Sequence, residues 1–68
     1  MNDTNLRKQQ ILEIAEKVFL ENGYRRTSIE KVAEACGLVK GSVLHYFGSK
    51  EKLYQAVLQT RRNQTVSI

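Results

Sequence analysis

The sequence contains no proline, a single cysteine and a single histidine. One cysteine excludes an intramolecular disulfide framework and a cysteine-rich zinc site. The histidine, His45, has no visible set of partner residues, whereas a general base needs a neighbour within hydrogen-bond reach and a metal ion needs several ligands. We therefore expect neither enzymatic activity nor a bound cofactor or metal ion.

Long apolar runs are also absent. No stretch approaches the roughly 20 residues that a helix needs to cross a bilayer. The N-terminal sequence MNDTNLRKQQ is polar and lacks the apolar region of a signal peptide. Together with the low cysteine content, these features predict a soluble protein of a reducing cytoplasm.

The chain has 68 residues, which suffices for one domain. A domain of this size buries only about 60% of the surface that its unfolded chain exposes, so its core has no room for an enclosed ligand cavity. Eleven lysine and arginine residues against seven acidic residues give a net charge of +4. This sign favours an acidic partner, with nucleic acid first and an anionic membrane second, although ordinary surface charge gives the same sum.

Glycines at positions 23, 37 and 48 divide the chain into segments that each carry apolar residues at helical spacing. The expected helices cover about residues 6–22, 27–36, 39–47 and 49–60. Thr27 and Glu30 have the spacing of a capping box, and Ser49 is a good N-cap for the last helix. The sequence thus predicts an all-α fold, a small bundle of about four helices over residues 5–62, followed by a polar tail at 63–68.

The apolar stripes of these segments predict the core. The residues expected to face inward are Ile11, Ile14, Ala15, Val18, Phe19, Ile29, Val32, Ala33, Cys36, Val43, Phe47, Leu53, Ala56 and Val57. Tyr24 and Tyr54 are interpreted as half-buried core residues rather than binding residues. Cys36 is interpreted as a small buried side chain, because free cysteine is often buried, and a redox-sensing thiol is the alternative.

Two short helices are expected to meet at a tight turn, Ala35-Cys36-Gly37-Leu38, within residues 28–47. Ala33 is small where the helices would cross, and Gly37 permits the backbone conformation that the turn needs. This is the pattern of a helix-turn-helix, whose second helix lies in the DNA major groove. That helix carries Lys, Ser, His and Tyr side chains besides its apolar residues, rather than a plain solvated face.

Basic residues occur near every expected helix start. Arg7 and Lys8 open the first helix, Arg25 and Arg26 precede the second, and Lys40 and Lys50 open the third and fourth. Cations at a helix N-terminus oppose the helix dipole unless an anion is bound there. Each placement alone fits chance, but their recurrence at all helix starts favours phosphate binding.

The stretch SIEKVAEACGLVKGSVLHYFGSKEKLYQAVL, residues 28–58, resembles the DNA-binding domain of the TetR family of transcriptional regulators. The resemblance extends over about residues 5–62. It is specific because the short third helix, the Tyr46-Phe47 pair and the Ser49-Lys50 helix start occur together. It implies sequence-specific binding of double-stranded DNA in a regulator, with repression as the expected direction.

The resemblance also implies residue roles. Positions where family members approach base edges are occupied by Lys40, Gly41, Ser42 and Leu44. Positions where they contact phosphates are occupied by Thr27, Ser28, Tyr46 and Lys50, and His45 fits either role.

Two positions depart from the family pattern. Val39 replaces the serine that often caps the third helix, so this helix start is expected to be less stable. Leu44 replaces a frequent tyrosine and cannot donate a hydrogen bond, but it can contact a thymine methyl group. Base reading near Leu44 is therefore expected to favour thymine.

Length is the largest departure, because family members carry a longer C-terminal domain that binds a small ligand and forms a homodimer on a palindromic operator. That domain has no counterpart within these 68 residues. An excised domain, a truncated gene product and a fragment all fit this length. For this chain alone we expect a monomer or a weak dimer.

A small helical protein-interaction module is the main alternative function. The cations at helix starts and a third helix that fits the DNA major groove argue against a protein-interaction function. A membrane-active basic peptide is a further alternative, but it would form one long amphipathic helix without glycine breaks.

Overall fold

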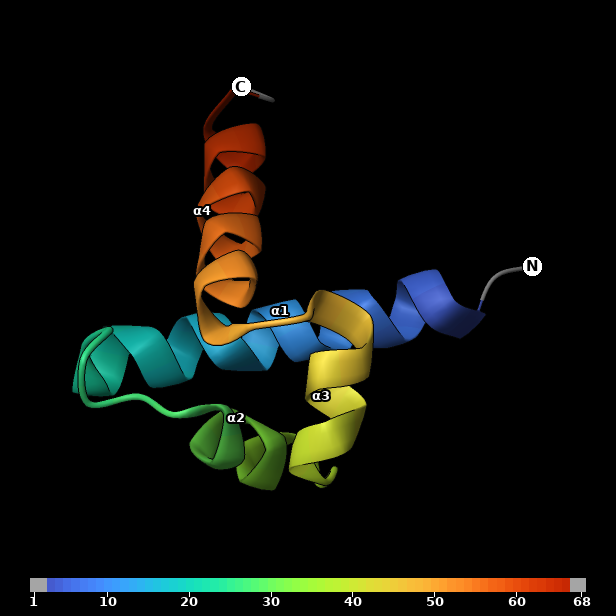
Figure 1. Cartoon of the computed structure of the whole chain (residues 1–68). Helices are drawn as coiled ribbons and strands as arrows, with labels where there is room; N and C mark the ends of the chain where they lie inside the picture. The colour runs from blue at the N-terminus through green and yellow to red at the C-terminus, as the bar shows by residue number, and fades with distance from the viewer. Residues whose placement is uncertain (1–2, 67–68) are drawn as a thin grey trace.

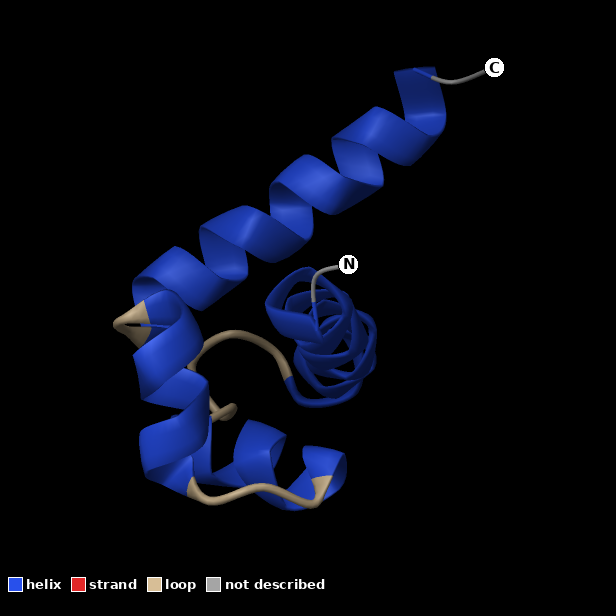
Figure 2. Cartoon of the chain, turned by 90° about the vertical axis from the view of Figure 1, so that its right-hand side faces the viewer, coloured by secondary structure: helices blue, strands red, loops and turns tan. Residues whose placement is uncertain are grey.

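The computed structural model describes residues 3–66, with side chains described for residues 6–60, and this part of the chain forms four helices and no strand. Helix α1 spans Asp3–Asn22, α2 spans Ile29–Cys36, α3 spans Lys40–Phe47 and α4 spans Lys50–Val66. The long α1 lies in the middle, with α2 on one side and α4 on another (Figure 1). Viewed along α1, α3 connects α2 to α4 at the edge of the bundle (Figure 2). The predicted all-α fold is confirmed.

The core lies between α1 and the helices that pack against it. Ile11, Ala15 and Phe19 recur every four residues of α1 and form one buried stripe. The buried residues of the other helices are Ile29, Val32, Ala33, Val43, Leu53 and Val57. Flanking residues that the sequence placed in the core are only half-buried, namely Ile14, Val18, Cys36, Phe47 and Ala56. The bundle is 17 Å across its thinnest dimension, so residues beside a stripe remain in reach of solvent.

Two predicted helix limits are wrong. Helix α1 begins at Asp3 rather than Leu6, which places Arg7 and Lys8 inside the helix and not at its start. Helix α4 continues to Val66, beyond the expected end near Thr60. No glycine or proline follows Thr60, and arginine and glutamine favour helix, so nothing stops it there. Residues 63–66 of the expected polar tail are helical, and residues 67–68 lie outside the described part.

The predicted capping box at the start of α2 is also wrong, because the cap lies one residue later. Ser28 is the N-cap, and its Oγ accepts a hydrogen bond from the Lys31 backbone N–H at 3.1 Å. Thr27 is 1% exposed, and its Oγ1 donates to the Gly23 carbonyl oxygen at 2.8 Å. Thr27 therefore holds the loop between α1 and α2 instead of capping α2.

Candidate nucleic-acid interface

The turn between α2 and α3 sets the relative placement of these two helices. Gly37 has φ 73° and ψ 27°, a left-handed conformation that residues other than glycine rarely adopt. Its N–H donates to the Glu34 carbonyl at 3.1 Å, and the Leu38 N–H donates to the Ala33 carbonyl at 2.8 Å. These bonds satisfy two carbonyl groups in the last turn of α2, those of Ala33 and Glu34, and end the helix. The turn predicted from Gly37 is confirmed.

Helix α3 is held to the bundle by one face. Val43 is completely buried, while Leu44, Tyr46 and Phe47 pack partly against the core. The opposite face carries Gly41, which is exposed, and beside it the half-buried Ser42 and the exposed His45. One side of α3 is thus free to enter a groove without disturbing the core.

The start of α3 has no side-chain cap. Val39 occupies the N-cap position, makes no capping hydrogen bond and is 70% exposed. The expected loss of the cap at this helix start is confirmed. The first backbone N–H groups of α3 are therefore not satisfied by a capping side chain, and such N–H groups suit a phosphate or another acceptor.

Lys40, the first residue of α3, is on the exposed surface. Its Nζ lies 3.9 Å from Glu30 Oε2, and the two side chains are 54% and 71% exposed. An ion pair this exposed is weak, because water and salt screen the charges. The Lys40 ammonium can therefore leave Glu30 for a stronger acceptor at little cost.

His45 and Tyr46 lie next to each other near the end of α3. Their rings form an edge-on pair with centroids 5.6 Å apart. His45 is exposed, whereas Tyr46 is half-buried with part of its ring against the core. Leu44 is likewise half-buried, so only its outer part is available for contact with a base.

The loop between α3 and α4 determines the position of Lys50. The Gly48 N–H donates to the Leu44 carbonyl at 2.7 Å and closes α3. Ser49 Oγ accepts from the Lys52 backbone N–H at 3.1 Å, which confirms the predicted N-cap of α4. Lys50 follows as the first residue of α4, and its Nζ lies 4.2 Å from the centroid of the Tyr24 ring.

The contact between Lys50 and Tyr24 was missed by the sequence analysis, which treated Tyr24 only as half-buried core. Tyr24 is more exposed than expected, at 38%, although its ring contacts Phe19 and Tyr54. No spacing rule links a residue after α1 to a residue that opens α4. The sequence signal was limited to an aromatic residue beside the glycine that ends α1.

The loop before α2 presents Arg25 and Arg26 as exposed residues next to Ser28. Ser28 is half-buried, and its hydroxyl oxygen accepts a hydrogen bond from the Lys31 N–H, which leaves the hydroxyl hydrogen to donate elsewhere. Thr27 is enclosed, and its hydroxyl hydrogen is used within the loop. The geometry thus separates Thr27 from the other candidate phosphate contacts, Ser28, Tyr46 and Lys50.

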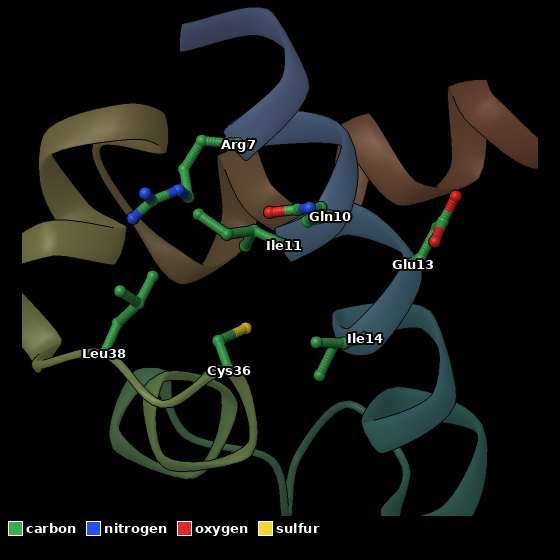
Figure 3. Close-up of a pocket in the computed structure, with 7 residues that line it drawn as sticks. All are labelled: Arg7, Gln10, Ile11, Glu13, Ile14, Cys36 and Leu38. Carbon is green, nitrogen blue, oxygen red and sulfur yellow. The ribbon is translucent and has the colours of Figure 1, made fainter. Parts of the chain in front are cut away.

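A groove of about 330 Å³ lies between α1 and the turn after α2 (Figure 3). Its rim includes Arg7, Gln10 and Glu13, which are exposed, so the groove is on the surface and not enclosed in the core. Cys36 and Leu38 line its other side. Burial raises the pKa of the Cys36 thiol, which favours the protonated, less nucleophilic form.

The described residues contain neither a metal-ligand cluster nor a membrane-spanning helix. No three His, Cys, Asp or Glu side chains among them are grouped so that they could hold a metal ion. Within the same part of the chain, none of the helices has the length and apolar character needed to cross a membrane.

Residues 11–57 match the family of bacterial regulatory proteins described as the tetR family. The chain belongs to this family. The repressor AcnR of Corynebacterium efficiens is 40% identical over 63 residues, which cover 88% of this chain and 34% of AcnR. The repressor KstR2 of Mycobacterium tuberculosis is 36% identical over 55 residues, which cover 81% of this chain and 28% of KstR2.

A solved structure has the same fold. The hemolysin II transcriptional regulator HlyIIR superimposes with a TM-score of 0.79 at 34% identity, over 82% of this chain and 31% of HlyIIR. The chain thus spans about a third of the length of these transcriptional regulators. It carries the DNA-binding helix-turn-helix domain of a tetR-family transcriptional regulator, and the protein-interaction alternative is not favoured.

Proposed function

We propose that this domain binds double-stranded DNA in a sequence-specific manner with α3 in the major groove. The observation that carries the proposal is the division of α3 into two faces. Val43 is completely buried, while Gly41 and His45 are exposed on the opposite side. The major groove is about 12 Å wide and admits one such helix.

The base-reading residues are Lys40, Gly41, Ser42, Leu44 and His45. Lys40 is a donor for guanine acceptors, and the outer part of Leu44 suits the thymine methyl group. Gly41 lets the helix backbone approach closely. Ser42 and His45 offer hydrogen-bonding groups beside it.

The phosphate-contacting residues are Tyr46 within α3, Ser28 at the start of α2 and Lys50 at the start of α4. Phosphate contacts fix the register of the protein on the duplex without reading sequence. Thr27 supports this surface from behind, because its buried hydroxyl holds the loop that presents Ser28. Arg25 and Arg26 add positive charge to the same loop.

The regulator to which this domain belongs is proposed to be a repressor, as its named relatives AcnR and KstR2 are. It would bind a palindromic operator as a homodimer, with half-sites separated by about 34 Å, one turn of DNA, or more. This chain by itself would bind a single half-site weakly as a monomer. Because the family is bacterial and the proposed target is DNA, the proposed site of action is the cytoplasm.

A fluorescence-anisotropy titration tests the first part of the proposal, that the domain binds double-stranded DNA. The purified chain is added to a labelled random-sequence duplex, and to the matching single strand, at several salt concentrations. We expect preferential binding to the duplex, with an affinity that falls steeply as salt rises because counterions are released from phosphates. No duplex binding even at low salt would reject the proposal and return a protein partner to first place.

A further inference from the structure

The side chain of Lys50 is held by an aromatic ring from a distant part of the sequence. Its Nζ lies over the Tyr24 ring, 4.2 Å from the centroid. A lysine ammonium within about 6 Å of a ring centroid is attracted by the negative face of the ring. Lys50 opens α4, whereas Tyr24 follows the end of α1, so the contact joins two separate elements.

The ring that holds Lys50 is itself fixed by two others. Tyr24 stacks on Phe19 with an interplanar angle of 15° and centroids 5.9 Å apart. The centroid of the Tyr24 ring also lies 4.8 Å from that of Tyr54, and the Tyr54 and Phe19 centroids are 4.9 Å apart. Phe19 is only 5% exposed and belongs to the core. These three rings, Phe19, Tyr24 and Tyr54, are called the aromatic cluster below.

The aromatic cluster packs against the side of α4 that carries Lys50. Tyr54 is one helical turn after Lys50, so both side chains project from the same side of the helix. Tyr24 fits between them and contacts each. The position of the Lys50 ammonium is therefore linked to the core through Tyr24 and Phe19.

We infer that Tyr24 is a positioning residue for the Lys50 phosphate contact, an inference that rests on the proposed function. A free lysine side chain has many rotamers, and binding must select one of them. The Tyr24 ring holds Lys50 in one rotamer before DNA binds, and it covers one side of the ammonium group. An ammonium has three N–H donors, so the solvent side stays available for a phosphate oxygen.

The test is a double-mutant cycle on the full chain. DNA affinity is measured for Tyr24→Leu and Tyr24→Phe, each with Lys50 present and in the Lys50→Gln background. With Lys50 present, Tyr24→Leu should weaken binding about two- to fivefold, as expected for an exposed cation–π contact. Tyr24→Phe keeps the ring face and should bind like the unchanged chain. In the Lys50→Gln background, Tyr24→Leu should have no further effect.

A purely structural role for Tyr24 would give the same loss in both backgrounds, and that result would overturn the inference. Tighter binding by Tyr24→Leu would also overturn it, because the ring would then compete with phosphate for Lys50. Thermal unfolding of each variant shows that binding is measured on folded protein. If Tyr24→Leu fails to fold, the ring contact is tested by NMR in the unchanged chain. In the unchanged chain, the Hε protons of Lys50 should resonate upfield of those of a lysine without a ring contact. The same upfield shift should appear in Tyr24→Phe. Unshifted Hε protons in the unchanged chain would reject the contact.

The outcomes separate this inference from the proposed function. If Lys50→Gln leaves both affinity and salt dependence unchanged, Lys50 does not contact phosphate and the proposed role of Lys50 fails. If Lys50→Gln weakens binding but Tyr24→Leu does not, the phosphate contact stands and only the positioning role of Tyr24 fails.

Discussion

Lys40 and Glu30 form an ion pair between the first turns of α3 and α2, with 3.9 Å between Nζ and Oε2. Because both side chains are exposed, the pair contributes at most about 1 kcal/mol to stability. The ion pair places Lys40 at the start of α3, the helix that we assign to the major groove. Glu30 holds the ammonium there until a stronger acceptor replaces it.

Lys40→Ala is therefore expected to change sequence preference at one or two base pairs, by about 1–3 kcal/mol, with little change in stability. Competition between labelled and unlabelled duplexes that differ at single positions measures this preference. Glu30→Ala is the matched control, because it removes the partner and leaves the lysine in place. Equal weakening on every sequence would move Lys40 to the phosphate-contacting group.

Lys50→Ala should weaken binding to all duplexes alike. It removes one phosphate contact, so the slope of log affinity against log salt should fall by about one unit. Lys17→Ala removes the same charge from an exposed position on α1 and is the control for net charge. A changed base preference in Lys50→Ala, or an equal change in slope in Lys17→Ala, would contradict the assignment.

Gly41→Ala should change stability and DNA binding in opposite directions. A Cβ added at Gly41 meets nothing within 4 Å, and the residue lies in α3, so alanine should stabilise the free domain by about 0.5 kcal/mol. If the backbone at Gly41 approaches the bases, the added methyl should weaken binding by about 1–3 kcal/mol. Thermal unfolding and anisotropy measure the two effects. Unchanged affinity would show that DNA does not approach this position.

Gly37→Ala should destabilise the domain by about 1–2 kcal/mol, because Gly37 has φ 73° and alanine disfavours that conformation. A Cβ at this position meets nothing within 4 Å, so the cost comes from the backbone and not from crowding. Gly37→Asn should cost less, since asparagine tolerates left-handed geometry better than alanine. Urea unfolding of both variants gives the comparison. An alanine variant as stable as the unchanged chain would show that the turn adopts another conformation.

The sequence predicts structure correctly where local chemistry determines it. Gly37 and Gly48 correctly located the ends of α2 and α3, and Ser49 the start of α4, because each effect acts within one helical turn. It failed at Thr27, where two hydroxyl residues stand side by side and tertiary packing decides which one caps. It also ended α4 near Thr60 because polarity was mistaken for a stop signal.

For the candidate interface, helix periodicity and the family resemblance were sufficient to nominate the surface of α3. They did not reveal that Leu44 and Tyr46 are half-buried, because exposure at the edge of a stripe depends on how the neighbouring helices pack. The contact between Tyr24 and Lys50 was beyond sequence reasoning for a similar reason. It exists only once α1 and α4 are packed together.

Base reading by α3 can be tested by selecting bound sequences from a random duplex pool with the purified chain at moderate salt. We expect an enriched motif with thymine preferred at one position, as a single half-site for a monomer or as a palindrome if two copies bind together. Salt-dependent binding without any enriched motif would contradict the claim, because the domain would then contact phosphates without reading sequence.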